Sequence, residues 1–139
     1  MFLASLNNEQ KELFLELCIH AAQSDGAIEL QEHTAMTQYI AEMGLNDYPT
    51  EVSIPLEEVF EKLKAISTQA ELRIITIEIM ALLLVDDEYD VHEKLFMDAL
   101  KQNFEIADEE LNNEITLIKR LIDIYDRLKA FITGESVNP

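Results

Sequence analysis

The sequence predicts an all-α fold, a bundle of about six helices, and three observations support this prediction. Glycine and proline together contribute only six of the 139 residues, so the chain has few turn-forming positions. Apolar residues recur at spacings of three and four along most of the chain, as they do on one face of a helix. The third observation is a pattern of acidic turns with flanking apolar positions that occurs twice, once around Asp25 and once around Asp86. The length is that of one domain, spanning residues 1–139.

The first two helices are expected on either side of an acidic turn. Asn7 or Asn8 is suited to cap a helix that extends to the turn at Asp25, because asparagine accepts a hydrogen bond from the first-turn amides. A second helix is expected over residues 29–43, where apolar positions again follow a helical period. Gly44 then supplies a C-terminal stop.

The third and fourth helices follow the one long loop that the sequence predicts, residues 46–54. The third helix is expected over residues 55–66 and opens with a proline, which is favoured in the first turn. Thr68 and Glu71 match the capping-box pattern and open a fourth helix over residues 68–85. This fourth helix is apolar almost all round, so we expect it to be the central and most buried one.

A fifth helix is expected over residues 90–104 and a sixth over residues 108–133. The apolar residues of the sixth helix cover an arc of about 200° at about 100° per residue. A helix with such a wide apolar surface is expected to pack against two neighbours.

The two acidic turns belong to a longer internal repeat, with repeat one at about residues 8–43 and repeat two at about residues 68–104. When the chain is aligned with itself so that Asp25 meets Asp86, chemically similar positions coincide: Ile28 with Tyr89, Glu29 with Asp90, Glu32 with Glu93, and Met36 with Met97. The simplest explanation is a helix–turn–helix hairpin that is used twice and packed about a pseudo-two-fold axis.

The charge of the chain limits its partners. There are 28 acidic and 10 basic residues, for a formal net charge of −18. A surface this negative repels nucleic-acid phosphates and anionic lipid headgroups, so neither is expected as a partner. A cation or a basic protein surface is the natural partner, although acidic charge also serves solubility alone. The oligomeric state does not follow from the sequence.

A few features of the sequence bear on where the protein is located and on whether it is an enzyme. The single cysteine, Cys18, cannot form an intramolecular disulfide and is expected to be a packed thiol in a reducing compartment. The start of the chain lacks the pattern of a signal peptide, and the most apolar stretch, residues 74–85, is too short to span a bilayer. The expected location is cytoplasmic. No phosphate-binding loop or nucleophile with a positioned histidine is evident, so we expect no enzymatic activity.

Part of the acidity in the two turns is explained by helix capping. Glu29 and Glu32, and likewise Asp90 and Glu93, are expected at helix starts, where carboxylates interact favourably with the helix dipole. Asp25 and its equivalent are expected at the opposite, negative helix ends, where acids are disfavoured.

The disfavoured acids suggest a bound cation. Asp86, Asp87 and Glu88 are consecutive at a helix end, and a divalent ion with oxygen ligands would offset their repulsion. The spacing lacks the glycine and the final glutamate of an EF-hand, so the two turns would have to pool their ligands. The candidate ligands are Asp25, Glu32, Asp86 and Glu93, with Glu29, Asp87, Glu88 and Asp90 as secondary candidates.

Oxygen ligands favour Ca²⁺ or Mg²⁺ over Zn²⁺. Three histidines, His20, His33 and His92, flank the turns without the spacing of a dedicated zinc motif. The alternative to a metal is a solvated acidic surface with Lys94 and Arg73 as partial counterions.

Several stretches resemble the TerB-like tellurite-resistance family. The resemblance to its first repeat is carried by residues 1–6, 10–17, 22–28 and 38–45, and that to its second repeat by residues 86–93. It implies an all-α fold of paired helical hairpins, a role in tellurite resistance or the general stress response, and cation binding by Asp25, Glu32, Asp86 and Glu93. This chain departs from the family at Asp87, where glycine is usual, so Asp87 either adapts the turn or adds a ligand.

Overall fold

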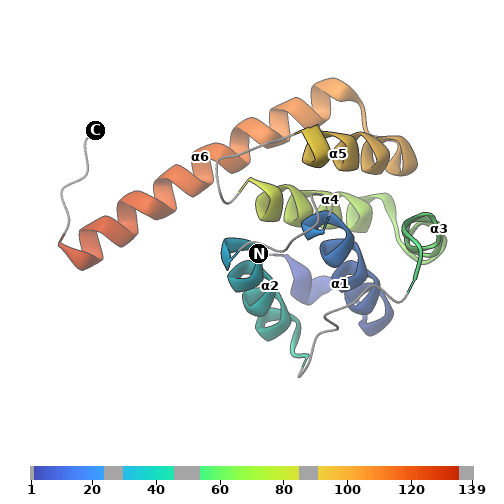
Figure 1. Cartoon of the computed structure of the whole chain (residues 1–139), viewed down its shortest axis with the longest axis horizontal. Coiled ribbons are helices and arrows are strands. Elements are labelled where there is room, and N and C mark those ends of the chain that lie inside the picture. The colour runs from blue at the N-terminus through green and yellow to red at the C-terminus, as the bar shows by residue number, and fades with distance from the viewer. Residues whose placement is uncertain (1, 24–29, 46–53, 85–90, 135–139) are drawn as a thin grey trace.

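The computed structural model describes residues 2–23, 30–45, 54–84 and 91–134, and all regular structure within these residues is helical. The prediction of an all-α fold is therefore confirmed. The elements follow one another as a short 3₁₀ helix and six α-helices: η1 (Leu3–Ser5), α1 (Asn8–Ala22), α2 (Leu30–Met43), α3 (Leu56–Ile66), α4 (Gln69–Leu83), α5 (Val91–Phe104) and α6 (Asp108–Thr133) (Figure 1).

Helix α4 is the centre of the bundle, as its nearly uniform apolar sequence predicts. It lies between α5 on one side and α1 and α2 on the other, and it also packs against η1 and α6 (Figure 1). Its buried residues cover more than one face, and they include Leu72, Ile75, Ile79, Leu82 and Leu83. Such a helix is stabilised mainly by burial of apolar surface on all sides.

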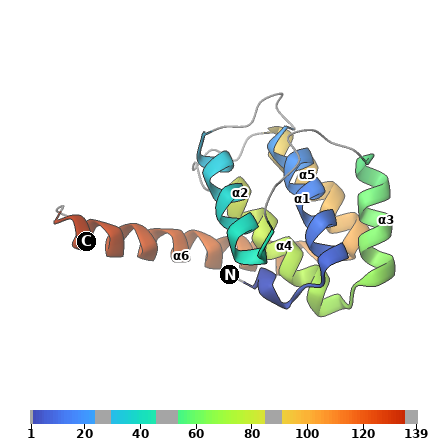
Figure 2. The ribbon, with the colours of Figure 1, turned by 90° about the horizontal axis from the view of Figure 1, so that it is seen from below.

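Helix α6 is only partly covered by the bundle. Leu111 and Ile118 in its N-terminal half are buried, and the helix packs against α4. The C-terminal half projects away from the other helices in both views (Figures 1 and 2). A helix of 26 residues is about 39 Å long, whereas the 15 residues of α4 span about 22 Å. The expectation that α6 packs against two neighbours is therefore wrong for its C-terminal half, which extends past the helix that supports it.

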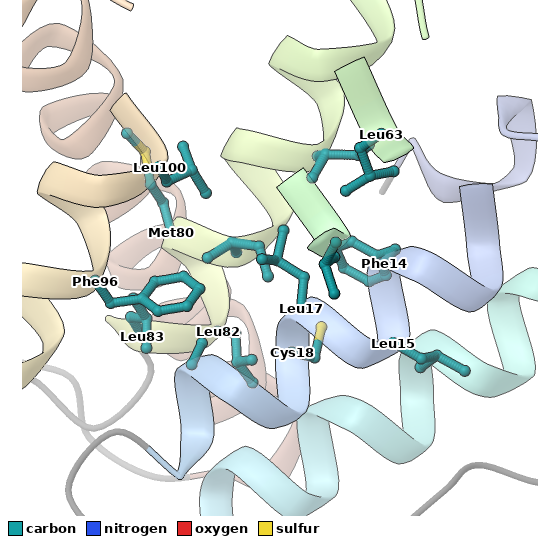
Figure 3. Close-up of a cluster of buried hydrophobic side chains, with 14 of the residues drawn as sticks. Phe14, Leu15, Leu17, Cys18, Leu63, Met80, Leu82, Leu83, Phe96 and Leu100 are labelled. Atoms are coloured by element: carbon teal, nitrogen blue, oxygen red, sulfur yellow. The ribbon is translucent and has the colours of Figure 1, made fainter. Parts of the chain in front are cut away.

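The hydrophobic core is formed where α1, α3, α4 and α5 meet (Figure 3). Phe60 of α3 is 1% exposed and stacks edge-on against Phe104, with ring centroids 5.5 Å apart, while Phe96 lies on another side of it. Phe14 makes a similar contact with Tyr39 of α2. The contacts of Phe60 join α3 to α5, and the contact of Phe14 joins α1 to α2.

The two helices of the first expected repeat have the same bounds as the two helices of the second when one constant is added to their residue numbers. Helices α1 and α4 begin at Asn8 and Gln69 and end at Ala22 and Leu83, so both ends differ by the offset that takes Asp25 to Asp86. The same offset relates α2 to α5 at the ends of these helices, Met43 and Phe104.

The helix starts also correspond. Asn7 caps α1 by accepting from the Gln10 amide at 2.8 Å, and Gln10 Oε1 accepts from the Asn7 amide at 2.9 Å. At the equivalent positions Thr68 and Glu71 exchange the same two hydrogen bonds, at 3.1 and 2.9 Å. Both first helices therefore begin with a reciprocal capping box.

The ends of α2 and α5 correspond as well. Gly44 has φ of 73°, and Glu105, its counterpart in the second repeat, has φ of 57°. The amide of the next residue closes the same wide turn in both places, from Leu45 to Ile40 and from Ile106 to Lys101, each at 3.0 Å. This left-handed residue with a bond back into the last turn is the Schellman arrangement of a helix C-terminus.

The elements that precede the two hairpins occupy corresponding places. Segment η1 packs against α2 and α4, and α3 packs against α5 and α1. Segment η1 therefore contacts α2, the second helix of the hairpin that follows it, and α4, the first helix of the other hairpin. In the same way, α3 contacts α5, the second helix of the hairpin that follows it, and α1, the first helix of the other hairpin. This exchange of neighbours is what a two-fold relation between the hairpins produces.

Candidate metal centre

The described ends of both acidic turns lie at one end of the bundle. Helices α1 and α4 finish there, and α2 and α5 start there, as Figure 2 shows at its upper side. Gln23 and Leu30 bound the first turn, and Leu84 and Val91 bound the second.

Most of the expected ligands lie outside the described residues: Asp25, Glu29, Asp86, Asp87, Glu88 and Asp90. Glu32 lies on α2, but its side chain is outside the described part of the chain, as is that of His33. Glu93 is the remaining expected ligand and its side chain is described.

Glu93 is a buried acidic residue. It lies in the first turn of α5 and is 6% exposed. The positive end of the helix dipole stabilises a carboxylate at this position. A buried carboxylate nevertheless requires hydrogen bonds or positive charge close to it to offset its desolvation. Its place in the first turn of α5 is the one expected for a helix-start carboxylate, and its role as a cation ligand stays a prediction.

A groove of about 480 Å³ lies at the same end of the molecule, between α1, α3 and α5. It is lined by His20, Gln23, Leu56, His92, Leu95, Phe96 and Ala99. Two of the three histidines, His20 and His92, therefore share one cavity although they are not equivalent in the two repeats. The sequence could not indicate this pairing, because it depends on how α1 and α5 pack.

His20 is held in one orientation by the backbone. Its Nε2 atom lies 2.8 Å from the carbonyl oxygen of Ile54. A carbonyl only accepts, so Nε2 carries the proton and donates, and Nδ1 is left as the atom that could accept or bind a metal. His92 is exposed at the start of α5. Two imidazoles at one groove give a zinc ion fewer ligands than its usual four.

A second group of acidic side chains binds the N-terminal segment to the bundle. Glu78 is 1% exposed, and its Oε1 atom accepts from the Phe2 amide at 2.8 Å. Glu42 accepts from the Leu3 amide at 3.2 Å, and the Tyr39 hydroxyl donates to the Glu78 carbonyl oxygen at 2.8 Å. The role of Glu78 was not predicted from the sequence, although an acid within an otherwise apolar helix is a signal for a buried polar contact.

Cys18 is a packed core residue, as the sequence predicts. It is 0% exposed, and burial, followed by the charge of Glu78, raises the pKa of its thiol well above the ordinary value. Burial also raises the pKa of the neighbouring Tyr39 hydroxyl, with further contributions from Cys18, Glu78 and Glu42. A neutral, inaccessible thiol is unsuited to act as a nucleophile or as a thiolate ligand.

Among the described side chains, no three histidine, cysteine, aspartate or glutamate residues lie close enough together to hold a metal ion. None of the described helices combines the length and the apolar character needed to cross a membrane. No protein-family model, curated protein or solved structure matches this chain.

Proposed function

We propose that this chain is a duplicated helical-hairpin domain of the TerB-like type that binds one divalent cation between its two acidic turns. Asp25, Glu32, Asp86 and Glu93 are the proposed ligands, and Ca²⁺ or Mg²⁺ is the proposed ion. The domain acts without catalysis, in the cytoplasm, in a stress response of the tellurite-resistance type.

The proposed duplication is supported by features that no single helix requires. The two hairpins share their helix bounds, their reciprocal capping boxes and their left-handed C-terminal residues, all at the offset that takes Asp25 to Asp86. Helix propensity alone would not reproduce these bounds and both kinds of cap at one constant spacing.

The observation that carries the metal proposal is that both turns begin and end at the same end of the bundle. Ligands contributed by two separate turns can converge only if the helices deliver them to one region. Glu93 adds a buried carboxylate to that region. Oxygen ligands of this kind are the ones that Ca²⁺ and Mg²⁺ prefer.

Thermal unfolding provides the test. The purified protein is treated with a chelator and then supplied with Ca²⁺, Mg²⁺, Mn²⁺ or Zn²⁺ at constant ionic strength. An ion that binds only the folded state at about 100 times its Kd stabilises that state by about 2.7 kcal/mol. We expect this gain in the wild type and its loss in Asp86→Asn. The control Asp126→Asn, on the exposed surface of α6, should keep the gain. Absence of an ion-specific shift in the wild type would refute cation binding.

A second candidate function is metal-free binding of a basic protein through the acidic surface. It is favoured by the formal charge of −18. Such association is screened by salt, because the Debye length is about 8 Å in physiological salt. We expect binding of a basic partner to weaken steeply as salt rises and to be unaffected by a chelator. Association that persists unchanged in high salt would argue against this role.

A further inference from the structure

The C-terminal half of α6 exposes a continuous apolar surface. We call residues 117–134 the α6 arm. Its apolar side chains that are more than half exposed are Leu117, Ile124, Tyr125, Leu128, Phe131 and Ile132. Phe131, at 82%, is the most exposed of them. Monomeric proteins rarely expose this many large apolar side chains side by side, and such surfaces are typical of interaction sites.

The spacing of these residues is that of a coiled coil. Leu117, Leu121, Ile124, Leu128 and Phe131 are separated alternately by four and three residues, which is the heptad pattern of a helix–helix seam. This set, the seam, runs along the arm for about 21 Å at about 1.5 Å per residue. The occupant that matches a heptad seam is another α-helix.

The bundle does not use the seam. A different flank of α6, formed by Leu111, Ile115, Ile118 and Ile122, packs on the core. In contrast, three seam residues towards the tip, Ile124, Leu128 and Phe131, are more than half exposed. The seam therefore faces away from the contacts that hold α6 on its own chain.

The arm differs in charge from the rest of the molecule. It holds four of the ten basic residues but only two of the 28 acidic ones, so six bases and 26 acids remain elsewhere. Within the described residues, Lys119, Arg120 and Lys129 form no ion pair, and Arg127 pairs only within the arm, with Asp123 at 3.2 Å. The arm is thus a cationic, apolar helix attached to a strongly anionic bundle.

We propose that the seam binds the α6 arm of a second copy of this chain in antiparallel orientation. In antiparallel orientation each cationic arm runs back towards the anionic bundle of its partner, and its tip ends near the partner's Glu114. It also keeps the two anionic bundles at opposite ends of the paired arms, which reduces their mutual repulsion. Parallel pairing would bring the bundles side by side and add repulsion.

The oligomeric state of the full chain tests the proposal. We expect sedimentation velocity to reveal a reversible equilibrium between the 15.9 kDa monomer and a dimer. Ile124→Glu should raise the dimer Kd by about tenfold or more, because it places a charge in the seam. Leu95→Glu is the matched control: Leu95 is 61% exposed on α5, close to the 52% of Ile124. This control should leave the Kd unchanged.

Three results would overturn the proposal. The first is that the wild type remains monomeric at every concentration. This result would count against the proposal whether or not the protein also sediments with anionic vesicles. Another is a dimer that Leu95→Glu disrupts and Ile124→Glu does not, which would place the interface on α5. The third is unchanged dimerisation in Ile124→Glu.

Cysteine cross-linking tests the orientation. The native Cys18 is buried and does not compete. In an antiparallel pair that sets Leu117 opposite Leu128, the two copies of residue 117 are about 16 Å apart along the helix, too far for a disulfide, which needs Cα atoms within about 7 Å. We expect no cross-link in Leu117→Cys alone under a mild oxidant. A mixture of Leu117→Cys and Leu128→Cys chains should form the disulfide-linked pair. Efficient self-cross-linking of Leu117→Cys would instead establish a parallel pair.

Discussion

Gln10 and Glu71 occupy the same position in the two capping boxes, and the side chain of Gln10 helps to lower the pKa of the Glu71 carboxyl. The Gln10 amide nitrogen also lies 3.0 Å from the Ser67 hydroxyl, next to the cap residue of α4. The start of α1 is thereby joined to the start of α4. Gln10 is fully buried at this contact between the two hairpins.

We expect Glu71 to make stability dependent on pH in the acidic range. The Thr68 amide first, and then the Gln10 side chain, lower the pKa of the Glu71 carboxyl below its ordinary value. A carboxyl whose pKa is lower in the folded state stabilises that state above its unfolded pKa, and the gain is lost as pH falls through the folded pKa. Wild type should therefore exceed Glu71→Gln in free energy of unfolding near neutral pH, and the difference should vanish in acid.

Chemical denaturation across the acidic range measures this difference. Glutamine at this position still completes a capping box, as Gln10 does in the first hairpin, so the comparison isolates the charge. A second measurement is an NMR titration of Glu71 in Gln10→Ala, in which its pKa should rise towards the ordinary value. A stability difference that stays constant with pH would contradict the assignment.

The left-handed residues at the ends of α2 and α5 predict opposite effects of two substitutions. Glu105 adopts φ of 57° at a cost that glycine does not bear, so Glu105→Gly should stabilise the protein by about 0.5–1 kcal/mol. Gly44→Ala should destabilise it by about 1 kcal/mol. No atom lies within 4 Å of a Cβ added at Gly44, so its cost is conformational rather than steric. Urea denaturation of the two variants gives both values; effects of equal sign would refute the shared C-terminal geometry.

Local signals in the sequence were sufficient to predict the fold class and the helices. Apolar spacing, the Thr68 cap and Gly44 act within one or two turns, and the structure places helix ends close to where they indicate. The second left-handed position was missed because a glutamate occupies it. The residue type indicates a left-handed position at a helix end only when glycine or asparagine occupies it.

The contacts between helices could not be predicted from the sequence, for a different reason. The shared groove of His20 and His92, the buried role of Glu78 and the exposed seam on α6 all depend on which helix faces which neighbour. An apolar arc on α6 indicates that something should cover it, but not whether that is the same chain. For the metal site, the sequence supplied the candidate residues, and Glu93 is the only one whose side chain the described part of the chain includes.

We expect Cys18 to be unreactive in the folded protein. Its thiol is buried, and burial together with the charge of Glu78 raises the thiol pKa and keeps it protonated well beyond neutral pH. Thiol reagents react with the thiolate, so modification requires unfolding. The rate of reaction with a disulfide reagent should therefore follow the unfolding equilibrium and rise steeply with denaturant. An exposed cysteine introduced by Thr116→Cys on α6 provides the control, and it should react at once in native buffer. Rapid native labelling of Cys18 would contradict its packed position.

Glu93 distinguishes capping from cation binding. If it only caps α5, Glu93→Gln should cost about 0.3–1 kcal/mol through the lost interaction with the helix dipole, and this cost should be the same in chelator and in saturating Ca²⁺ or Mg²⁺. If it is a ligand, the cost should grow when the ion is present, because the wild type gains binding free energy that the variant lacks. We expect the second result. Glu109→Gln, in the first turn of α6, is the control for an exposed helix-start glutamate outside the proposed site. Its cost should not respond to the ion, and an equal, ion-independent cost in both variants would reduce Glu93 to a helix cap.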